Sequence, residues 1–140
     1  MCIKLNFVGS VTISPTLESI HEPIGLFEEF LRNFEISSKD RMLWSLSLTE
    51  VLANSIRYGS DRVNGDMIHI HWKHELGRVS VTITDKGTGP WTGLIETPSL
   101  PEDLEAESGR GLFIVNSFVD VWLHRKSIEG YRQTLIKLIY

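Results

Sequence analysis

Apolar residues recur along this chain at two different periods, and the order of those periods predicts its helices and strands. Spacings of three and four residues, which are typical of an amphipathic helix, begin near Pro23 and return over residues 39–58. Alternation at every second residue, which is typical of a half-buried strand, is clearest over residues 78–84. A short helix is expected over residues 112–119. The remaining expected strands span residues 3–13, 67–74, 120–127 and 131–139.

The resulting order is one strand, two helices, two strands, a long loop, a helix and two strands. This order favours an α+β fold, a two-layer α/β sandwich in which helices cover one face of a mostly antiparallel sheet. Ser37 or Ser38 is expected to cap the second helix. The glycine- and proline-rich residues 85–111 show no period, which predicts a loop. Without an evident linker or repeat, residues 1–140 are expected to form a single domain.

Composition limits the function classes that fit such a fold. The chain has 18 acidic and 14 basic residues and a net charge of −4, which argues against direct binding to nucleic acid. Cys2 is the single cysteine, so an intrachain disulfide is impossible, and this fits a reducing compartment. No apolar run approaches a membrane span or a signal peptide in length. We therefore expect a soluble, cytoplasmic protein that does not associate with membranes.

Two polar residues interrupt the otherwise apolar second helix. Glu50 and Asn54 are four residues apart and therefore only about 40° apart around a helix, whereas Leu48, Leu52 and Ile56 lie roughly opposite. Because a buried carboxylate without a partner is costly, Glu50 is expected to face a cavity, a cation or water. The alternative is a half-exposed helix on which Glu50 faces solvent. The pair alone does not decide between these two interpretations.

Two glycine-containing segments offer further candidates, and the first follows a predicted strand. It places Asp85 at the strand end, with Gly87 and Gly89 directly after it. A carboxylate held there can accept a hydrogen bond from an exocyclic amine such as that of adenine, and glycines let the backbone pass close to a flat ring. Taken alone, the pattern is equally compatible with an ordinary turn between strands.

The second segment has Gly109, Arg110 and Gly111 directly before a helix expected to begin at Leu112. Free amides at a helix start bind phosphate, glycines let a phosphate reach them, and Arg110 adds a positive charge. The alternative is simply a flexible entry to a helix. Neither G-x-x-x-x-G-K-[ST] nor G-x-G-x-x-G occurs in the chain, so a phosphate site here would have another design.

Taken in this order, the three segments resemble the N, G1 and G2 boxes of the GHKL ATPase superfamily, which includes gyrase and the histidine kinases. Residues 50–54 resemble the N box, residues 85–89 the G1 box and residues 109–112 the G2 box. The short chain and the motif GRGLFIV most resemble the anti-sigma factor serine/threonine protein kinases of bacterial partner-switching systems. The resemblance spans nearly the whole chain and implies the Bergerat (GHKL) ATP-binding fold.

The resemblance also implies a role for each matched residue. Glu50 would act as general base, and Asn54 would coordinate Mg²⁺ beside the ATP phosphates. Asp85 would bind the adenine amino group. The other positions that the resemblance assigns to ATP binding are Gly87, Gly89, Gly109, Arg110, Gly111, Leu112 and, on the last strand, Thr134.

A lid and two departures from the family pattern complete the comparison. Residues 90–108 would form the lid over ATP. Tyr58 stands where many relatives have a histidine, and Pro90 and Trp91 follow the G1 box directly. Neither departure touches the residues that would serve as base and metal ligand.

Together these implications describe an ATP- and Mg²⁺-dependent protein serine kinase. Its substrate would be a small anti-sigma-factor antagonist, and it would sequester a second partner, a sigma factor or a similar regulator. The resemblance further implies a homodimer. Two alternatives stay open: a non-catalytic module that sequesters its partner with or without nucleotide, and the ATP-binding fragment of a histidine kinase.

Overall fold

The computed structural model describes residues 7–59, 65–87, 110–128 and 130–139. The described strands are β1 (Val8–Ile13), β2 (Ile68–Glu75), β3 (Arg78–Asp85), β4 (Val121–Ser127) and β5 (Gly130–Leu138). The described helices are α1 (His21–Leu31), α2 (Ser38–Asn54) and α3 (Arg110–Phe118), with the 3₁₀ helix η1 (Leu17–Ile20) and the π-helical turn η2 (Ser55–Gly59).

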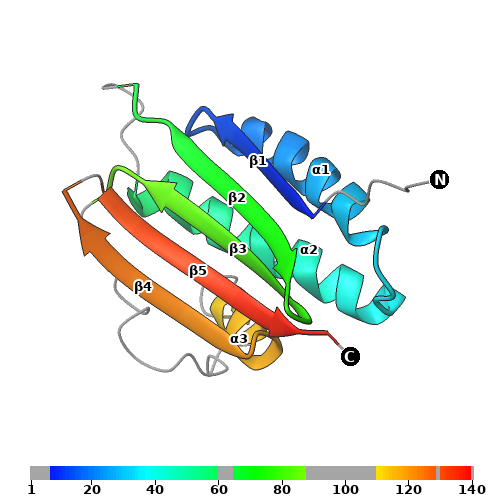
Figure 1. Ribbon diagram of the computed structural model, residues 1–140. Coiled ribbons are helices and arrows are strands. Elements are labelled where there is room, and N and C mark those ends of the chain that lie inside the picture. Colours follow the sequence, from blue (N-terminus) through cyan, green and yellow to red (C-terminus); the bar gives the residue numbers. More distant parts are fainter. Residues whose placement is uncertain (1–6, 60–64, 88–109, 129, 140) are drawn as a thin grey trace.

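These strands form one antiparallel sheet in the order β1-β2-β3-β5-β4. Helices α1, α2 and α3 all lie on the same side of that sheet, with α1 beside β1 and α3 beside β4 and β5 (Figure 1). The molecule is therefore the two-layer α+β sandwich that the hydrophobic pattern predicts. No helix in the described ranges is both long and apolar enough to cross a membrane.

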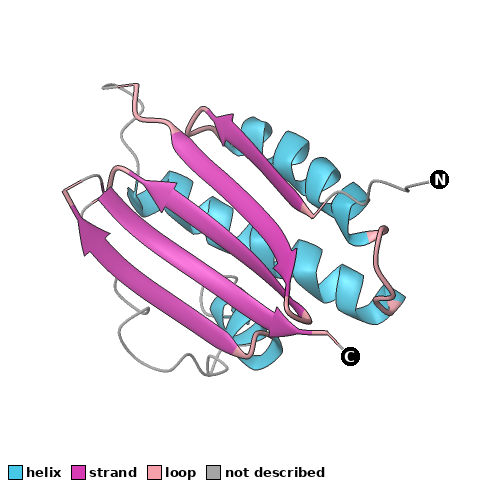
Figure 2. Cartoon of the chain, viewed as in Figure 1, coloured by secondary structure: helices cyan, strands magenta, loops and turns pink. Residues whose placement is uncertain are grey.

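The predicted elements are present (Figure 2), and the differences concern their ends. The second helix was expected to run to residue 58, but its α-helical part ends at Asn54 and continues as the π turn η2. α3 begins at Arg110 rather than at Leu112. The first strand begins at Val8, and the part of its predicted range before residue 7 lies outside the described residues.

Local chemistry explains where two of these elements begin and turn. Ser37 caps α2: its side-chain oxygen accepts a hydrogen bond of 3.1 Å from the Asp40 amide. Between β2 and β3, Leu76 and Gly77 both have positive φ, at 53° and 72°. Two consecutive positive φ angles are the signature of a tight two-residue hairpin turn, which fixes the register of the two strands. The predicted cap at Ser37 is confirmed.

The core lies between the sheet and the helices, and strand alternation decides which side chains enter it. In β2, Ile68, Ile70 and Trp72 are buried, whereas the intervening His69 and His71 are exposed on the opposite, open face. The same alternation buries alternate residues of β3 and β5 beneath the helices. Each strand therefore presents one set of side chains to the helices and another to the open face.

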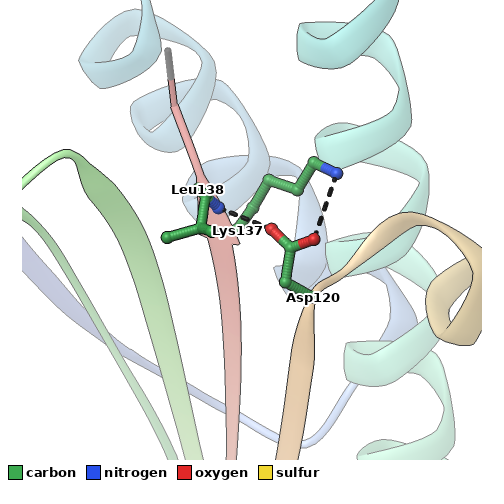
Figure 3. Close-up of polar contacts among 3 residues, drawn as sticks. All are labelled: Asp120, Lys137 and Leu138. Atoms are coloured by element: carbon green, nitrogen blue, oxygen red, sulfur yellow. Dashed lines mark hydrogen bonds and ion pairs between the residues drawn. The ribbon is translucent and has the colours of Figure 1, made fainter.

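Asp120, which lies between α3 and β4, makes polar contacts with two residues of β5 (Figure 3). Oδ2 of Asp120 accepts a hydrogen bond of 2.7 Å from the Leu138 amide, and its Oδ1 lies 3.7 Å from Nζ of Lys137. The Asp120 amide in turn donates to the Ile136 carbonyl at 2.9 Å. These contacts connect the end of α3 to β5, and they help to hold α3 against the sheet.

Candidate functional site

Asp85 is the last residue of β3, and its side chain is only 1% exposed. Oδ1 accepts a hydrogen bond of 2.7 Å from the Gly87 amide. Oδ2 is buried and has no hydrogen-bond partner among the described residues. Burial raises the pKa of the Asp85 carboxyl from 3.8 to about 6, against the opposing effects of the Gly87 amide and Ser55 and with a small further rise from Asp66. Within the described residues, one oxygen of this buried carboxylate thus has a hydrogen-bond partner and the other has none.

Ser55 links this strand end to α2. It begins the π turn immediately after Asn54 and is fully buried. Its hydroxyl lies close enough to Asp85 to lower the carboxyl pKa, yet Oγ of Ser55 and Oδ2 of Asp85 both lack a hydrogen bond of acceptable geometry among the described residues. Asn54 and Asp85, thirty-one positions apart in the sequence, therefore belong to one neighbourhood. A π turn is common at functional sites because it shifts the helix register locally.

Glu50 links the same helix to the start of α3. A Cβ atom added to Gly111 would overlap the Glu50 carboxylate and lie 2.7 Å from its Cγ. Only a glycine lets the helix start approach the carboxylate this closely. The second half of α2 therefore contacts both of the other segments, Glu50 against α3 and Ser55 against the end of β3.

The remaining predicted site residues are only partly described. Asn54 is half-buried at the end of α2, and Gly87 is half-buried in the turn after β3. Leu112 is half-buried and packs against Tyr131 of β5. Arg110 begins α3, but nothing is described of its side chain, nor of that of Tyr58. Gly89, Gly109 and the proposed lid, residues 90–108, lie outside the described ranges.

Thr134 lies on the last strand, β5, as the resemblance implies, but not on the face of the sheet that carries Asp85. On β5, Tyr131, Gln133 and Leu135 are buried toward the helices, so Thr134 belongs to the open face of the sheet. There its hydroxyl lies 3.3 Å from that of Thr82, its partner on β3. This face points away from Asp85, so the structure gives no support to the expected contact between Thr134 and adenine, which stays a prediction. The open face carries a separate depression, lined by His69, His71, Thr82, Thr84 and Arg132.

Gln133 occupies the inward position that Thr134 does not. Its side chain is fully buried, and its Oε1 accepts a hydrogen bond of 3.1 Å from Nε1 of Trp122 on β4. Its Nε2 has no hydrogen-bond partner among the described residues. The position of Gln133 between Tyr131 and Leu135, at the same parity of the predicted strand, is the sequence signal that could have identified it.

Tyr131 closes the site on the β5 side. It is directly opposite Asp85 in the antiparallel register, and its hydroxyl is hydrogen-bonded to the His124 ring. Burial, together with the charge of Asp85, raises the pKa of the Tyr131 hydroxyl to about 12. Tyr131 is therefore a neutral, buried neighbour of the Asp85 carboxyl.

Comparison with known proteins identifies the class to which this fold and site belong. The family model for the histidine kinase-like ATPase domain matches residues 13–138. The chain therefore belongs to the histidine kinase-like ATPase domain family, and the predicted superfamily is confirmed. ATP is accordingly the nucleotide that the family implies. The described site offers a buried acceptor oxygen on Asp85, and it has a helix start at Gly111 that lies against the Glu50 carboxylate.

Among solved structures, the chain is similar to the RsbU and RsbW domains of Rv1364c from Mycobacterium tuberculosis. The TM-score is 0.64 at 14% sequence identity, and the match covers 95% of this chain. It covers 32% of the other chain, so the present sequence spans about a third of that length. At this identity the likeness shows the fold. A search of curated proteins finds no match.

Proposed function

We propose that this chain is an ATP-dependent protein serine kinase that also sequesters a partner protein, as in a bacterial partner switch. The substrate would be a serine of a small antagonist protein, and the sequestered partner would be a sigma factor or an equivalent regulator. The observation that carries the proposal is the junction at the second half of α2. There Glu50 contacts the start of α3 and Ser55 adjoins the buried Asp85 of β3.

The chemistry of these residues fits the transfer of a phosphoryl group to a serine hydroxyl. The serine oxygen would attack the γ-phosphorus, its proton would pass to Glu50 as general base, and ADP would leave. The first amides of α3 have no acceptor within the helix and would be available to bind a phosphate. Asp85 would hold the adenine end through its free Oδ2.

Mg²⁺ would be held by the side-chain oxygen of Asn54, which is a hard ligand suited to a hard cation. Asn54 is half-buried at the end of α2, one residue before Ser55. When bound, the ion would neutralise phosphate charge. The position of Asn54 between Glu50 and Ser55 supports this assignment, because it lies on the helix segment that adjoins both other parts of the site.

The partner-switching role rests on two supports of different kinds. The sequence motif GRGLFIV resembles that of anti-sigma factor kinases, and the fold is similar to a structure that includes an RsbW domain. A homodimer is part of the same proposal. Retention of proteins on the immobilised chain, with and without ATP, identifies the antagonist and the sequestered regulator.

The decisive test is phosphoryl transfer from γ-labelled ATP to the antagonist found in that way. Wild-type protein should label a serine of the antagonist, and Glu50→Gln should reduce the rate by about 10²- to 10⁴-fold while keeping nucleotide binding. Glu29→Gln, on the exposed side of α1, is the matched control and should keep the wild-type rate.

Three results would each contradict a different part of the proposal. If ATP binds but no label moves, the chain is the non-catalytic sequestering module. If the label moves equally fast in Glu50→Gln, Glu50 is not the base. Label on a histidine instead of a serine would favour the histidine kinase alternative.

A further inference from the structure

Gln133 carries a buried hydrogen-bond donor for which the described protein provides no acceptor. A buried donor without a partner costs folding free energy, so such a group calls for a ligand, a water molecule or another explanation. Gln133 is 0% exposed and stands at an inward position of β5, between the buried Tyr131 and Leu135.

The orientation of the Gln133 amide follows from its neighbour. The Trp122 indole nitrogen can only donate, so its 3.1 Å contact with Gln133 must end on the amide oxygen. Nε2 is therefore the atom that remains without a partner among the described residues. The N–H group of Trp122 on β4 therefore fixes which end of the Gln133 amide faces β4, and it leaves the NH₂ group as the donor without a partner.

A complementary group on the same face of the sheet is the carboxylate of Asp85. Ile83 is directly opposite Gln133, and Asp85 is opposite Tyr131, two positions further along. Gln133 and Asp85 are thus diagonal neighbours on the helix-facing side, within reach of one another's long side chains. Yet Nε2 of Gln133 and Oδ2 of Asp85 are not hydrogen-bonded, and both are buried.

An unpaired donor beside an unpaired acceptor matches the edge of an adenine ring. The exocyclic amine of adenine donates, and the ring nitrogen next to it accepts. We propose that Gln133 is a second base-reading residue: its Nε2 donates to a ring nitrogen of adenine while Oδ2 of Asp85 accepts from the adjacent amine. This inference rests on the proposed ATP site and adds a specificity-determining residue to it.

The amine of adenine has an acceptor nitrogen on each side, N1 and N7, and each is removed in one available analogue. The test is therefore titration calorimetry of the full chain with ADP, 1-deaza-ADP and 7-deaza-ADP in the presence of Mg²⁺. Wild-type protein should bind one of the two analogues about tenfold more weakly than ADP, since one hydrogen bond is lost. The analogue that loses affinity identifies the nitrogen that Gln133 reads.

The variant Gln133→Met keeps the size of the side chain and removes the donor. It should bind ADP about tenfold more weakly than wild type and should no longer distinguish ADP from the sensitive analogue. Thr82→Val is the matched control on the open face of the neighbouring strand. It should keep both the affinity and the discrimination.

The outcomes separate this inference from the proposed function. If wild type binds ADP and both analogues equally, or if Gln133→Met still discriminates, Gln133 does not read the base although the nucleotide site stands. If wild type binds no ADP, both proposals fail. Equal binding of the three ligands by wild-type protein refutes the inference even when Gln133→Met does not fold.

Discussion

The layer of side chains between the helices and the sheet has two ends, and the residue types buried at the two ends differ. Beneath α1 the layer is aromatic: the ring of Phe27 lies 5.4 Å from that of Trp44 and 5.6 Å from that of Trp72, both edge-on. Phe30 stacks against Phe27 at 5.9 Å. Near the start of α3 three polar residues enter this layer: Asp85, Ser55 and Gln133 are each at most 1% exposed. These two regions are called the aromatic end and the polar end.

The two ends differ in how their hydrogen-bonding groups are satisfied. At the aromatic end the rings bury large apolar areas in preferred edge-to-face geometries, which stabilise the fold directly. Trp72 is an exception, because its Nε1 lies against Gly9 without a partner among the described residues. At the polar end all three residues carry an unpartnered atom in the described protein. Each such atom costs about 1–3 kcal/mol. Apolar packing is therefore concentrated at one end, and buried polar groups without a partner in the described protein are concentrated at the other.

Removing the central ring of the aromatic end should give the largest effect on stability. Phe27→Ala should lower the free energy of unfolding by about 3–5 kcal/mol, because the cavity left among Phe30, Trp44 and Trp72 cannot be refilled. Urea unfolding followed by circular dichroism measures this. Leu26→Ala, at a position 41% exposed on the same helix, should cost much less. A loss below about 1 kcal/mol in Phe27→Ala would refute the division between the two ends.

At the polar end, a substitution is expected to raise the free energy of unfolding instead of lowering it. Because the pKa of Asp85 is raised from 3.8 to about 6 in the folded protein, the folded state keeps a proton that the unfolded chain releases. The stability that this proton contributes is complete below about pH 4 and is lost as pH rises past 6, up to about 3 kcal/mol. Asp85→Asn removes this titration, so the variant should be the more stable protein at neutral pH.

Unfolding of wild type and Asp85→Asn should be compared across this pH range. The difference between them should grow with pH and level off above about pH 7. ADP affinity should fall at least about tenfold in the variant, since an amide N–H replaces an acceptor oxygen. A variant that is less stable than wild type at neutral pH would show that the carboxylate supports the fold. The exposed Glu35→Gln controls for the loss of one negative charge.

The architecture could be predicted because it depends on local periods. The alternation in residues 78–84 and the three-and-four spacing from residue 39 are visible in single segments, and each survives as β3 or α2. The cap at Ser37 depends only on its immediate neighbours. The π turn at Ser55 had no such signal, because the residues after Asn54 continue the helical pattern.

The site was harder to predict, because it depends on face and on distance in space. One position along β5 separates Gln133, which faces the helices, from Thr134, which does not. A shift by one residue moves a side chain to the other face of a sheet. The resemblance placed Glu50 and Gly111 in one site, but no local pattern indicates their direct contact, because 61 positions separate them in the sequence.

That contact provides a third prediction, smaller in stability but visible in catalysis. In Gly111→Ala the new Cβ would collide with the end of the Glu50 side chain, which is flexible and can move aside. The free energy of unfolding should change by less than about 1 kcal/mol. The displaced base should slow phosphoryl transfer by about 10- to 100-fold. Transfer and unfolding are measured on the same preparation.

A glycine near the aromatic end supplies the control for this substitution. A Cβ added to Gly25 of α1 would meet nothing within 4 Å. Gly25→Ala should therefore stabilise the protein by about 0.5–1 kcal/mol, because alanine favours a helix interior, and should leave transfer unchanged. Equal transfer rates in both alanine variants would mean that Glu50 takes no part in the reaction.

The smallest expected effect distinguishes two buried serines of the same helical segment. Ser47 and Ser55 are both fully buried, and neither hydroxyl has a hydrogen-bond partner among the described residues. Of these two serines, only Ser55 lowers the pKa of the Asp85 carboxyl.

An ionised carboxylate is the stronger acceptor for the adenine amine, so ADP affinity in wild type should fall as pH drops through about 6. In Ser55→Ala this midpoint should move to higher pH, and at neutral pH the affinity should fall by about threefold or less. Ser47→Ala should leave the midpoint in place, and titrations between about pH 5 and pH 8 measure it. Equal midpoints in the two variants would mean that Ser55 and Asp85 do not act together on the base.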